Sequence, residues 1–307
     1  MTARRKGEPV HGWLVLDKPA GAGSTRMVSE VKRLFAAEKA GHAGTLDPLA
    51  SGLLPIALGE ATKTVSFIMD GSKTYRFSIA WGEETPSDDA ETAPTARSAE
   101  RPTEQAILAA LPSFTGRLMQ VPPRFSAVKV EGERAYDLAR EGLQAELAAR
   151  PVEIARLELV AMPDRDHAEF ETDCGKGAYI RALARDLGRA LACLGRVAAL
   201  RRTRVGPFAE SDMISLESLQ QLRHKGAGPE GLISCLRPLE TALDDIPALA
   251  VSQAEASRLK QGQPILLRGR DAPIRLDAVY VTWRREPIAI GHIEGGVLKP
   301  RRVFNLG

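Results

Sequence analysis

The sequence predicts an α+β protein with a mixed, largely antiparallel sheet flanked by helices and a small all-β unit at its C-terminal end. Two segments, Thr74 to Gly82 and His167 to Cys174, alternate apolar and polar residues as half-buried strands do. Helical patterns lie between the strand patterns in mixed order, without a regular βαβ alternation. After about residue 248 the pattern changes to short strands separated by glycine and proline. This order favours α+β over a doubly wound fold.

The first expected elements are a strand and a helix. Trp13 to Leu16 is a short apolar run that leads into the turn-rich segment Asp17 to Gly21, and Ser24 or Thr25 can cap a helix there. That helix ends before Gly41 and has apolar residues at helical spacing: Val28, Val31, Leu34 and Phe35.

The central elements are a strand and two helices. The strand Thr74 to Gly82 has one apolar face, made of Tyr75, Phe77, Ile79 and Trp81. Thr103 to Leu111 reads as a capped helix that Pro112 terminates. The helix from Tyr179 to Leu194 has an apolar stripe and, beside it, a second stripe of cations: Arg181, Arg185 and Arg189.

An insertion and a C-terminal unit complete the prediction. Ser126 to Arg134 reads as a hairpin with Glu131 and Gly132 at its turn, and a helix containing Tyr136, Leu138, Leu143 and Leu147 follows. After a stretch marked by proline and glycine, strands are expected at 264–267, 279–283, 288–293 and 302–306. We expect one domain at 1–247, interrupted by an insertion at about 125–151, and a second at 248–307.

Composition restricts the class of protein. The chain has 307 residues, of which 44% are hydrophobic and 26% are charged, as in ordinary globular proteins. Its three cysteines are widely spaced, which argues against a disulfide framework or a zinc knuckle. The apolar run at Trp13 is too short for a signal peptide, and no stretch approaches the length of a membrane span. We therefore expect a cytoplasmic protein without a membrane partner.

Charge is unevenly distributed although the net charge is only +3. Residues 176–204 carry eight Lys/Arg and one Asp, and residues 260–307 carry nine Lys/Arg and four acids. Residues 83–104 reverse the sign with seven acids against two arginines, and with three prolines they are expected to form a solvated loop. Two basic zones on a nearly neutral chain predict a nucleic-acid face.

The densest motif is GHAGTLDP at Gly41 to Pro48. Its glycines free the backbone around His42, and Asp47 before Pro48 has the pattern of a helix N-cap with proline at the first helical position. Such an aspartate is most often a structural cap. A carboxylate at a helix N-terminus is, however, also kept ionised, as a nucleophile or base requires.

The segment GHAGTLDPLASGLLPIALGEATK resembles the catalytic segment of the TruB-type tRNA pseudouridine synthases, which isomerise uridine-55 in the T loop of tRNA. Further motifs in the same order resemble that family: LDKP at 16–19, KTYRF at 73–77, VPPRFSA at 121–127, GKGAYIR at 175–181 and LRRTR at 200–204. The resemblance is weakest in the acidic loop and in the last sixty residues. It implies the pseudouridine synthase fold, an inserted RNA-binding thumb and a PUA-like C-terminal domain.

The resemblance also implies catalytic roles. Asp47 would be the essential carboxylate acting on a flipped-out uridine, with Tyr75 against the uracil as packing platform and candidate proton acceptor at C5. Arg181 would pair with Asp47 and orient it. The sequence leaves open whether Asp47 adds to ribose C1′, adds to uracil C6, or abstracts a ribose proton to give a glycal.

Other residues are expected to bind the substrate. His42 would occupy the space that the flipped base leaves in the RNA, and Tyr179 and Leu200 would complete the base pocket. Lys18, in the lysine-proline motif, is also assigned to substrate binding. Some of the residues have a plainer interpretation. His42 between glycines could be an ordinary exposed loop side chain, Tyr75 and Leu200 could be core residues, and an isolated arginine such as Arg181 is usually a solvated surface charge.

The expected activity is an intramolecular isomerisation that needs no metal or cofactor, carried out on tRNA by a monomer without a protein partner. Two alternatives stay open: a tRNA-folding chaperone, and a guide-RNA-dependent pseudouridine synthase subunit. The chaperone explains the basic zones but not the joint presence of Asp47, Tyr75 and Arg181. A glycosidase is a more distant alternative, because only one obvious carboxylate is present where two facing acids are expected.

Overall fold

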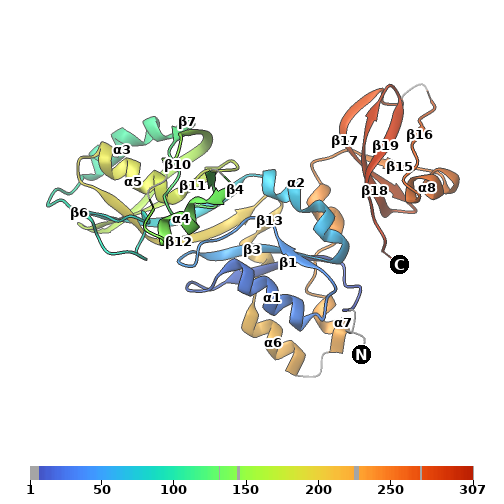
Figure 1. The fold of residues 1–307 in the computed structure, drawn as a ribbon, viewed down its shortest axis with the longest axis horizontal. Coiled ribbons are helices and arrows are strands. Elements are labelled where there is room, and N and C mark those ends of the chain that lie inside the picture. Colours follow the sequence, from blue (N-terminus) through green and yellow to red (C-terminus); the bar gives the residue numbers. More distant parts are fainter. Residues whose placement is uncertain (1–6, 131, 144–145, 225–227, 270–271, 307) are drawn as a thin grey trace.

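The computed structural model describes residues 7–306, apart from 131, 144–145, 225–227 and 270–271. In this part of the chain, ten strands form one mixed sheet whose main path runs β14-β1-β3-β12-β4-β11-β10-β7, with β2 on β3 and β13 on β12 (Figure 1). The strands are β1 Gly12–Lys18, β2 Ala40–His42, β3 Ser51–Leu58, β4 Lys73–Trp81, β7 Gly116–Gln120, β10 Arg150–Asp164, β11 His167–Cys174, β12 Gly195–Val205, β13 Phe208–Ala209 and β14 Ile214–Ser215. Most pairs are antiparallel, so the predicted α+β sheet is confirmed.

The sheet is joined at its centre by a short contact. Strands β3 and β12 pair in parallel only at Arg201 with Ser51 and Arg202 with Gly52. On one side of this junction lie β1, β2 and β14, and on the other lie β4, β11, β10 and β7. The loop that contains Asp47 immediately precedes β3, so it lies where the two halves of the sheet meet.

Helices cover one face of both halves. Helix α1 (Ser24–Leu34) packs with α6 (Leu216–His224) on the first half, and α5 (Ile180–Ala190) and α3 (Glu104–Ala110) pack on the second (Figure 1). Their apolar residues join the strands in one core cluster, which includes Val31, Leu183, Phe77, Ile79 and Trp81. The remaining helices and 3-10 turns are η1 Gly59–Thr64, α2 Val65–Asp70, η2 Leu111–Phe114, α4 Ala135–Arg140, η3 Glu210–Asp212, α7 Gly228–Ile233, η4 Leu239–Leu243 and α8 Gln253–Lys260.

Helix α5 ends four residues earlier than the apolar pattern predicted. Ala192 and Leu194 adopt positive φ, and the N–H groups of Cys193 and Leu194 both donate to the Gly188 carbonyl. The chain can turn back into β12 there because Gly188 lies against Gly195, where a Cβ on Gly188 would be 2.3 Å from the Gly195 nitrogen.

The second sheet contains five strands in the described residues, ordered β15-β17-β18-β19-β16. They are β15 Ala248–Ala250, β16 Ile265–Leu266, β17 Arg275–Trp283, β18 Glu286–Glu294 and β19 Val297–Val303, and α8 packs on them (Figure 1). The prediction of a strand at 302–306 is wrong in its position, because the last strand, β19, spans Val297–Val303. The sheet ends at Val303 because Phe304 is buried beside Trp13 and other core residues of the large sheet.

The insertion is shorter in regular structure than expected. Strands β8 (Lys129–Val130) and β9 (Glu133–Arg134) form the predicted hairpin, whose turn residue Glu131 lies outside the described residues. Helix α4 ends at Arg140, so Leu143 and Leu147 are not part of it. Two more short strands, β5 (Glu83–Glu84) and β6 (Ala96–Arg97), pair with each other at the acidic segment. No described helix is long and apolar enough to cross a membrane.

Candidate active site

A cleft of about 280 Å³ gathers most of the residues that the sequence singled out. Asp47, Tyr75, Tyr179, Arg181 and Leu200 all line it, although they come from four separate parts of the chain. Its wall also includes Ser126 and Ala127 at the base of the insertion. His42 and Lys18 are not among the lining residues.

Asp47 lies in a loop and not at a helix N-terminus, so the predicted helix after Pro48 is wrong. The Ala50 N–H donates to the Asp47 carbonyl in a single turn, and β3 begins at Ser51. A helix cannot form because Ser51 onward is required as a buried strand between β1 and β12. The helix dipole therefore does not act on this carboxylate, and its electrostatic partner is a side chain.

That partner is Arg181, as expected. Its Nε lies 2.8 Å from Asp47 Oδ2, in an ion pair between a side chain that is 4% exposed and one that is 36% exposed. The Nε–H does not point at a described acceptor, so the contact is electrostatic and not a hydrogen bond. The other guanidinium nitrogens donate to the carbonyls of Ser87 and Phe125, at 2.9 and 2.8 Å. Arg181 thus connects Asp47 to the acidic loop and to the insertion.

The acidic loop is not the solvated segment that its composition predicted. Thr85, Ser87, Asp88 and Asp89 are each less than 5% exposed. Asp89 Oδ2 lies 3.6 Å from Arg181, and Asp88 pairs with Arg185 at 2.8 Å. Burial raises the pKa of Asp88 to about 6, against the opposing effect of Arg185 and Arg181. Arg181 and Arg185 are buried too, because the acidic loop covers them and supplies their carboxylate partners. Two of the three arginines in the cationic stripe expected on α5 are therefore enclosed.

The loop around Asp47 is held by hydrogen bonds from several elements. The Ser24 hydroxyl donates to the Leu46 carbonyl and accepts from the Leu46 N–H, at 2.8 and 2.9 Å. Ser24 is therefore an anchor for this loop, and Gly23 occupies the cap of α1. The Leu49 N–H donates to Glu91 of the acidic loop at 3.1 Å. The sequence did not predict that Ser24 and Glu91 hold this loop, because their partners Leu46 and Leu49 are distant from them in the chain.

Lys18 belongs to the same set of anchors. It is completely buried, and its Nζ donates to the carbonyls of Pro19, Ala22 and Pro48. An ammonium group has three donors, so these bonds leave none for a substrate. Burial lowers the pKa of Lys18 to about 8, with Asp47 acting in the opposite direction. The geometry supports a role in holding Pro48 and opposes the expected direct contact with substrate.

The remaining cleft residues meet at the ends of β4 and β12. Tyr75 is half-buried on the same strand face as Phe77, and burial raises the pKa of its phenol. Leu200 is 7% exposed and lies opposite Phe77 in the sheet. Tyr179 caps α5, and its N–H and C=O are both bound by the amide of Gln120, at 2.8 and 3.1 Å. Burial likewise raises the pKa of the Tyr179 phenol.

His42 is the last residue of β2 and is half-buried outside the cleft. Its Nδ1 is buried, and no hydrogen-bond partner for it occurs among the described residues. Burial lowers the pKa of the imidazole, and the charge of Arg202 lowers it further. The ring is thus favoured in its neutral form, which suits stacking and apolar contact.

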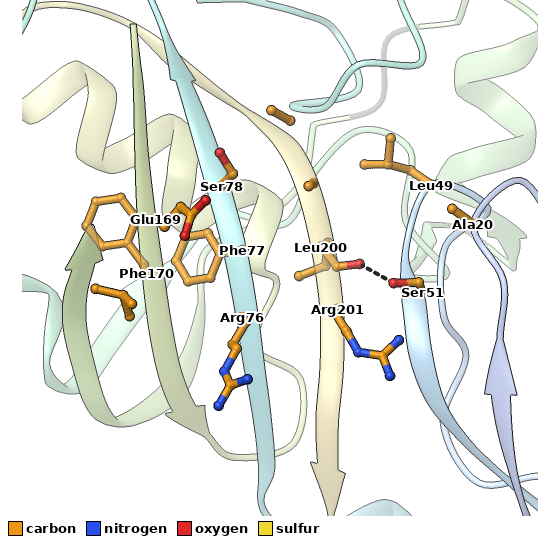
Figure 2. Close-up of a pocket in the computed structure, with 13 residues that line it drawn as sticks. Ala20, Leu49, Ser51, Arg76, Phe77, Ser78, Glu169, Phe170, Leu200 and Arg201 are labelled. Carbon is orange, nitrogen blue, oxygen red and sulfur yellow. Dashed lines mark hydrogen bonds between the residues drawn. The ribbon is translucent and has the colours of Figure 1, made fainter. Parts of the chain in front are cut away.

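A second cavity of about 420 Å³ is larger but does not contain Asp47. Its lining includes Arg76, Ser78 and Arg201, and also Phe77 and Leu200 (Figure 2). Leu200 therefore borders both this cavity and the cleft. The Ser51 hydroxyl donates to the Leu200 carbonyl at the edge of the larger cavity, at 3.4 Å. This cavity has no carboxylate paired with a buried arginine among the described residues, so the smaller cleft is the candidate active site.

Known proteins resemble this chain over its whole length. Residues 32–180 match the N-terminal domain model of the TruB family of pseudouridylate synthases, 181–244 match the tRNA pseudouridylate synthase B C-terminal domain, and 247–304 match the pseudouridine synthase II TruB C-terminal model. The tRNA pseudouridine synthase B of Nitrobacter winogradskyi is 61% identical, over 99% of this chain and 85% of the relative. That of Bradyrhizobium diazoefficiens is 60% identical, over 99% of this chain and 88% of the relative.

Solved structures give the same fold at lower identity. The archaeal box H/ACA sRNP Nop10-Cbf5 complex contains a chain that matches with a TM-score of 0.74 and 23% identity, covering 98% of this chain and 92% of that one. A Cbf5-Nop10-Gar1 complex matches with a TM-score of 0.72 and 24% identity, covering 96% of this chain and 85% of that one.

Proposed function

Because the chain belongs to the TruB family of pseudouridylate synthases, we propose that it isomerises uridine-55 in the T loop of tRNA to pseudouridine. The observation that carries this proposal is the cleft in which a partly exposed carboxylate, Asp47, is paired with the buried Arg181 beside the phenol of Tyr75. We further propose that the protein acts in the cytoplasm as a monomer without a protein partner.

The reaction exchanges one bond of the nucleoside for another. The N1–C1′ bond breaks, the C5–C1′ bond forms, the C5 proton is lost, and N1 regains a proton, so mass and oxidation state are unchanged. A paired uridine must leave its stack to reach the cleft, at a cost of a few kcal/mol. We propose that Tyr75, Tyr179 and Leu200 receive the flipped base and that His42 fills the space left in the RNA.

Asp47 supplies the essential carboxylate in this proposal. About a third of its side chain is exposed to the cleft, while its loop is fixed by Ser24, Lys18 and Glu91. A carboxylate held in one place loses little entropy when it meets the ribose or the uracil ring. Tyr75 is proposed to accept the C5 proton. Residues 125–151 and 248–307 are proposed to grip the RNA as a thumb and a PUA-like domain.

The test is chemical mapping of the modified nucleotide. Unmodified tRNA is incubated with the protein, treated with carbodiimide and alkali, and read by primer extension. A stop at the T-loop uridine is expected, and it should be missing for tRNA in which this uridine is cytidine. Tight tRNA binding without any stop would favour a folding chaperone and would contradict the proposal.

A further inference from the structure

Arg202 is a buried arginine in the wall of the cleft. It lies on β12, is 1% exposed, and its side chain reaches the same cavity as Asp47 and Tyr75. Its neighbour Arg201 points to the opposite face of the sheet, into the cavity of Figure 2. A guanidinium taken out of water is costly unless its donors are satisfied, so its contacts identify what it does.

The first set of contacts is with the chain on both sides of Asp47. Nη2 donates to the Gly44 carbonyl at 3.0 Å and Nη1 to the Thr45 carbonyl at 3.5 Å. Nε donates to the Leu53 carbonyl, at the start of β3, at 2.8 Å. One planar side chain therefore fixes the beginning and the end of the segment that presents the carboxylate. A lysine could not hold these three acceptors, because it lacks the planar fork.

The second contact is with Tyr75. Arg202 lies directly opposite Tyr75 in the antiparallel pair of β12 and β4, so the two side chains share a face and are neighbours. Burial raises the pKa of the phenol, and the Arg202 cation acts against that rise. The Cys174 thiol and Asp47 act on the phenol in the same direction as burial. Lys73, Lys176, Tyr179 and Arg181 are further titratable groups that line the same cleft.

The charge of Arg202 also differs from that of Arg181. Arg181 lies within 4 Å of two carboxylates, those of Asp47 and Asp89. Arg202 makes its hydrogen bonds to carbonyl groups, and no carboxylate of the described residues pairs with it. Its positive charge is therefore not neutralised by a direct ion pair among the described residues. Tyr75 can accept a proton only as phenolate, and a neighbouring cation stabilises that form.

We propose that Arg202 is a positioning residue of the isomerisation, which fixes the Asp47 loop through its carbonyl groups and keeps a positive charge beside the phenol of Tyr75. The inference rests on the proposed function, because it assigns Arg202 to that reaction. This role differs from a purely structural one because the rate depends on the charge of Arg202 as well as on its hydrogen bonds.

The rate test compares three variants in single-turnover assays with excess enzyme. Arg202→Gln removes the charge and should lower the rate about 100-fold, while tRNA affinity stays within about three-fold of wild type. Arg202→Lys keeps the charge with poorer geometry and should lose about ten-fold. Arg201→Gln is the matched control, because this guanidinium pairs with Asp17 and Glu210 on the other face, and its rate should equal that of wild type.

The second readout is the titration of Tyr75 itself, followed by NMR with tyrosine labelled at Cζ. The chain has four tyrosines, and Tyr75→Phe identifies the signal. Removal of a cation destabilises phenolate, so the Tyr75 midpoint should rise by about one pH unit in Arg202→Gln and stay near wild type in Arg202→Lys. This measurement needs no turnover, so it separates failure of this inference from failure of the proposed function.

Two results would overturn the proposal. A wild-type rate in Arg202→Gln would mean that the residue has no part in the reaction. Equal losses in the Gln and Lys variants, with the Tyr75 midpoint unchanged in both, would show a structural role alone. If Arg202→Gln does not fold, as a thermal melt would reveal, Arg202→Lys decides: a rate loss of more than about 100-fold despite the retained charge would contradict the account.

Discussion

The segments 176–204 and 260–306 are both rich in arginine, but they use it differently. In the first, acids of the loop at 83–89 neutralise four arginines in turn: Glu83 pairs with Arg196, Glu84 with Arg189, Asp88 with Arg185, and Asp89 lies near Arg181. In the second, Arg268, Arg284, Arg285, Arg301 and Arg302 are exposed. Three arginines of the first segment, Arg181, Arg185 and Arg202, are buried, whereas the second segment presents its arginines at the surface.

This difference separates two tasks that charge can perform. A buried arginine fixes the position of its partners, and changes to it should alter the rate of the chemical step. An exposed arginine attracts phosphates, and changes to it should alter affinity and its dependence on salt. Several cations of the first basic zone are occupied by ion pairs with acids, whereas the second zone presents exposed arginines that are available to contact phosphates.

The largest effect is expected at Asp47, which pairs with the buried Arg181. Asp47→Asn should lower turnover at least about 1000-fold, because the amide has nearly the same shape but no negative charge. Thermal unfolding and tRNA binding should change little, since the loop is held by Ser24 and Lys18 and not by the carboxylate. A thermal melt, filter binding and a single-turnover assay measure stability, tRNA affinity and rate. A rate above a thousandth of wild type would exclude Asp47 as the essential carboxylate.

The next largest effect is expected for Arg181→Lys, which should lower the rate about 100-fold. A lysine keeps the charge but cannot hold the Ser87 and Phe125 carbonyls while it faces Asp47. Arg189→Lys is a matched control on the same helix, because the Arg189 side chain is about half exposed and pairs with Glu84, away from Asp47. If both variants keep wild-type rates, burial of the first segment has no bearing on catalysis.

A stability effect is expected at Lys18. Burial lowers its pKa from 10.5 to about 8, so between these values the unfolded chain binds more protons and the free energy of unfolding rises with pH. Relative to Lys18→Met, wild type should gain ~2 kcal/mol between about pH 7 and about pH 10. Urea unfolding at both pH values measures this difference, and a constant difference would mean that Lys18 titrates normally in the folded protein.

The smallest effect is expected on the exposed second segment. The double change Arg301→Gln with Arg302→Gln should weaken whole-tRNA binding a few-fold and reduce its log-log salt slope by about 0.7 to 0.9 per lost phosphate contact. Single-turnover rates at saturating enzyme should be unchanged. Arg165→Gln, an exposed arginine in the turn between β10 and β11, is the control. Equal salt slopes in all three proteins would show that this surface does not contact phosphates.

Local pattern predicted the sheet and helix α5, because strand alternation and helical spacing are properties of neighbours in sequence. The set of residues in the cleft was predicted from the resemblance of the ordered motifs to the TruB-type family, and not from local pattern. It failed where distant segments decide the outcome. The acidic loop is buried because α5 supplies its counter-ions, and Asp47 lacks a helix because β3 must begin at Ser51. The roles of Ser24, Gln120 and Arg202 depend on partners far away in the chain, so no local signal could indicate them.

Release of the C5 hydrogen tests the central claim most directly. Transfer of C1′ from N1 to C5 must expel one hydrogen from C5 and free no uracil, whereas a glycosidase would free uracil and a chaperone would do neither. With tRNA that carries tritium at C5 of the T-loop uridine, wild type and the surface control Asp164→Asn should release one tritium per tRNA. Asp47→Asn should release almost none in the same time. Release of free uracil, or equal tritium release by Asp47→Asn, would contradict the account.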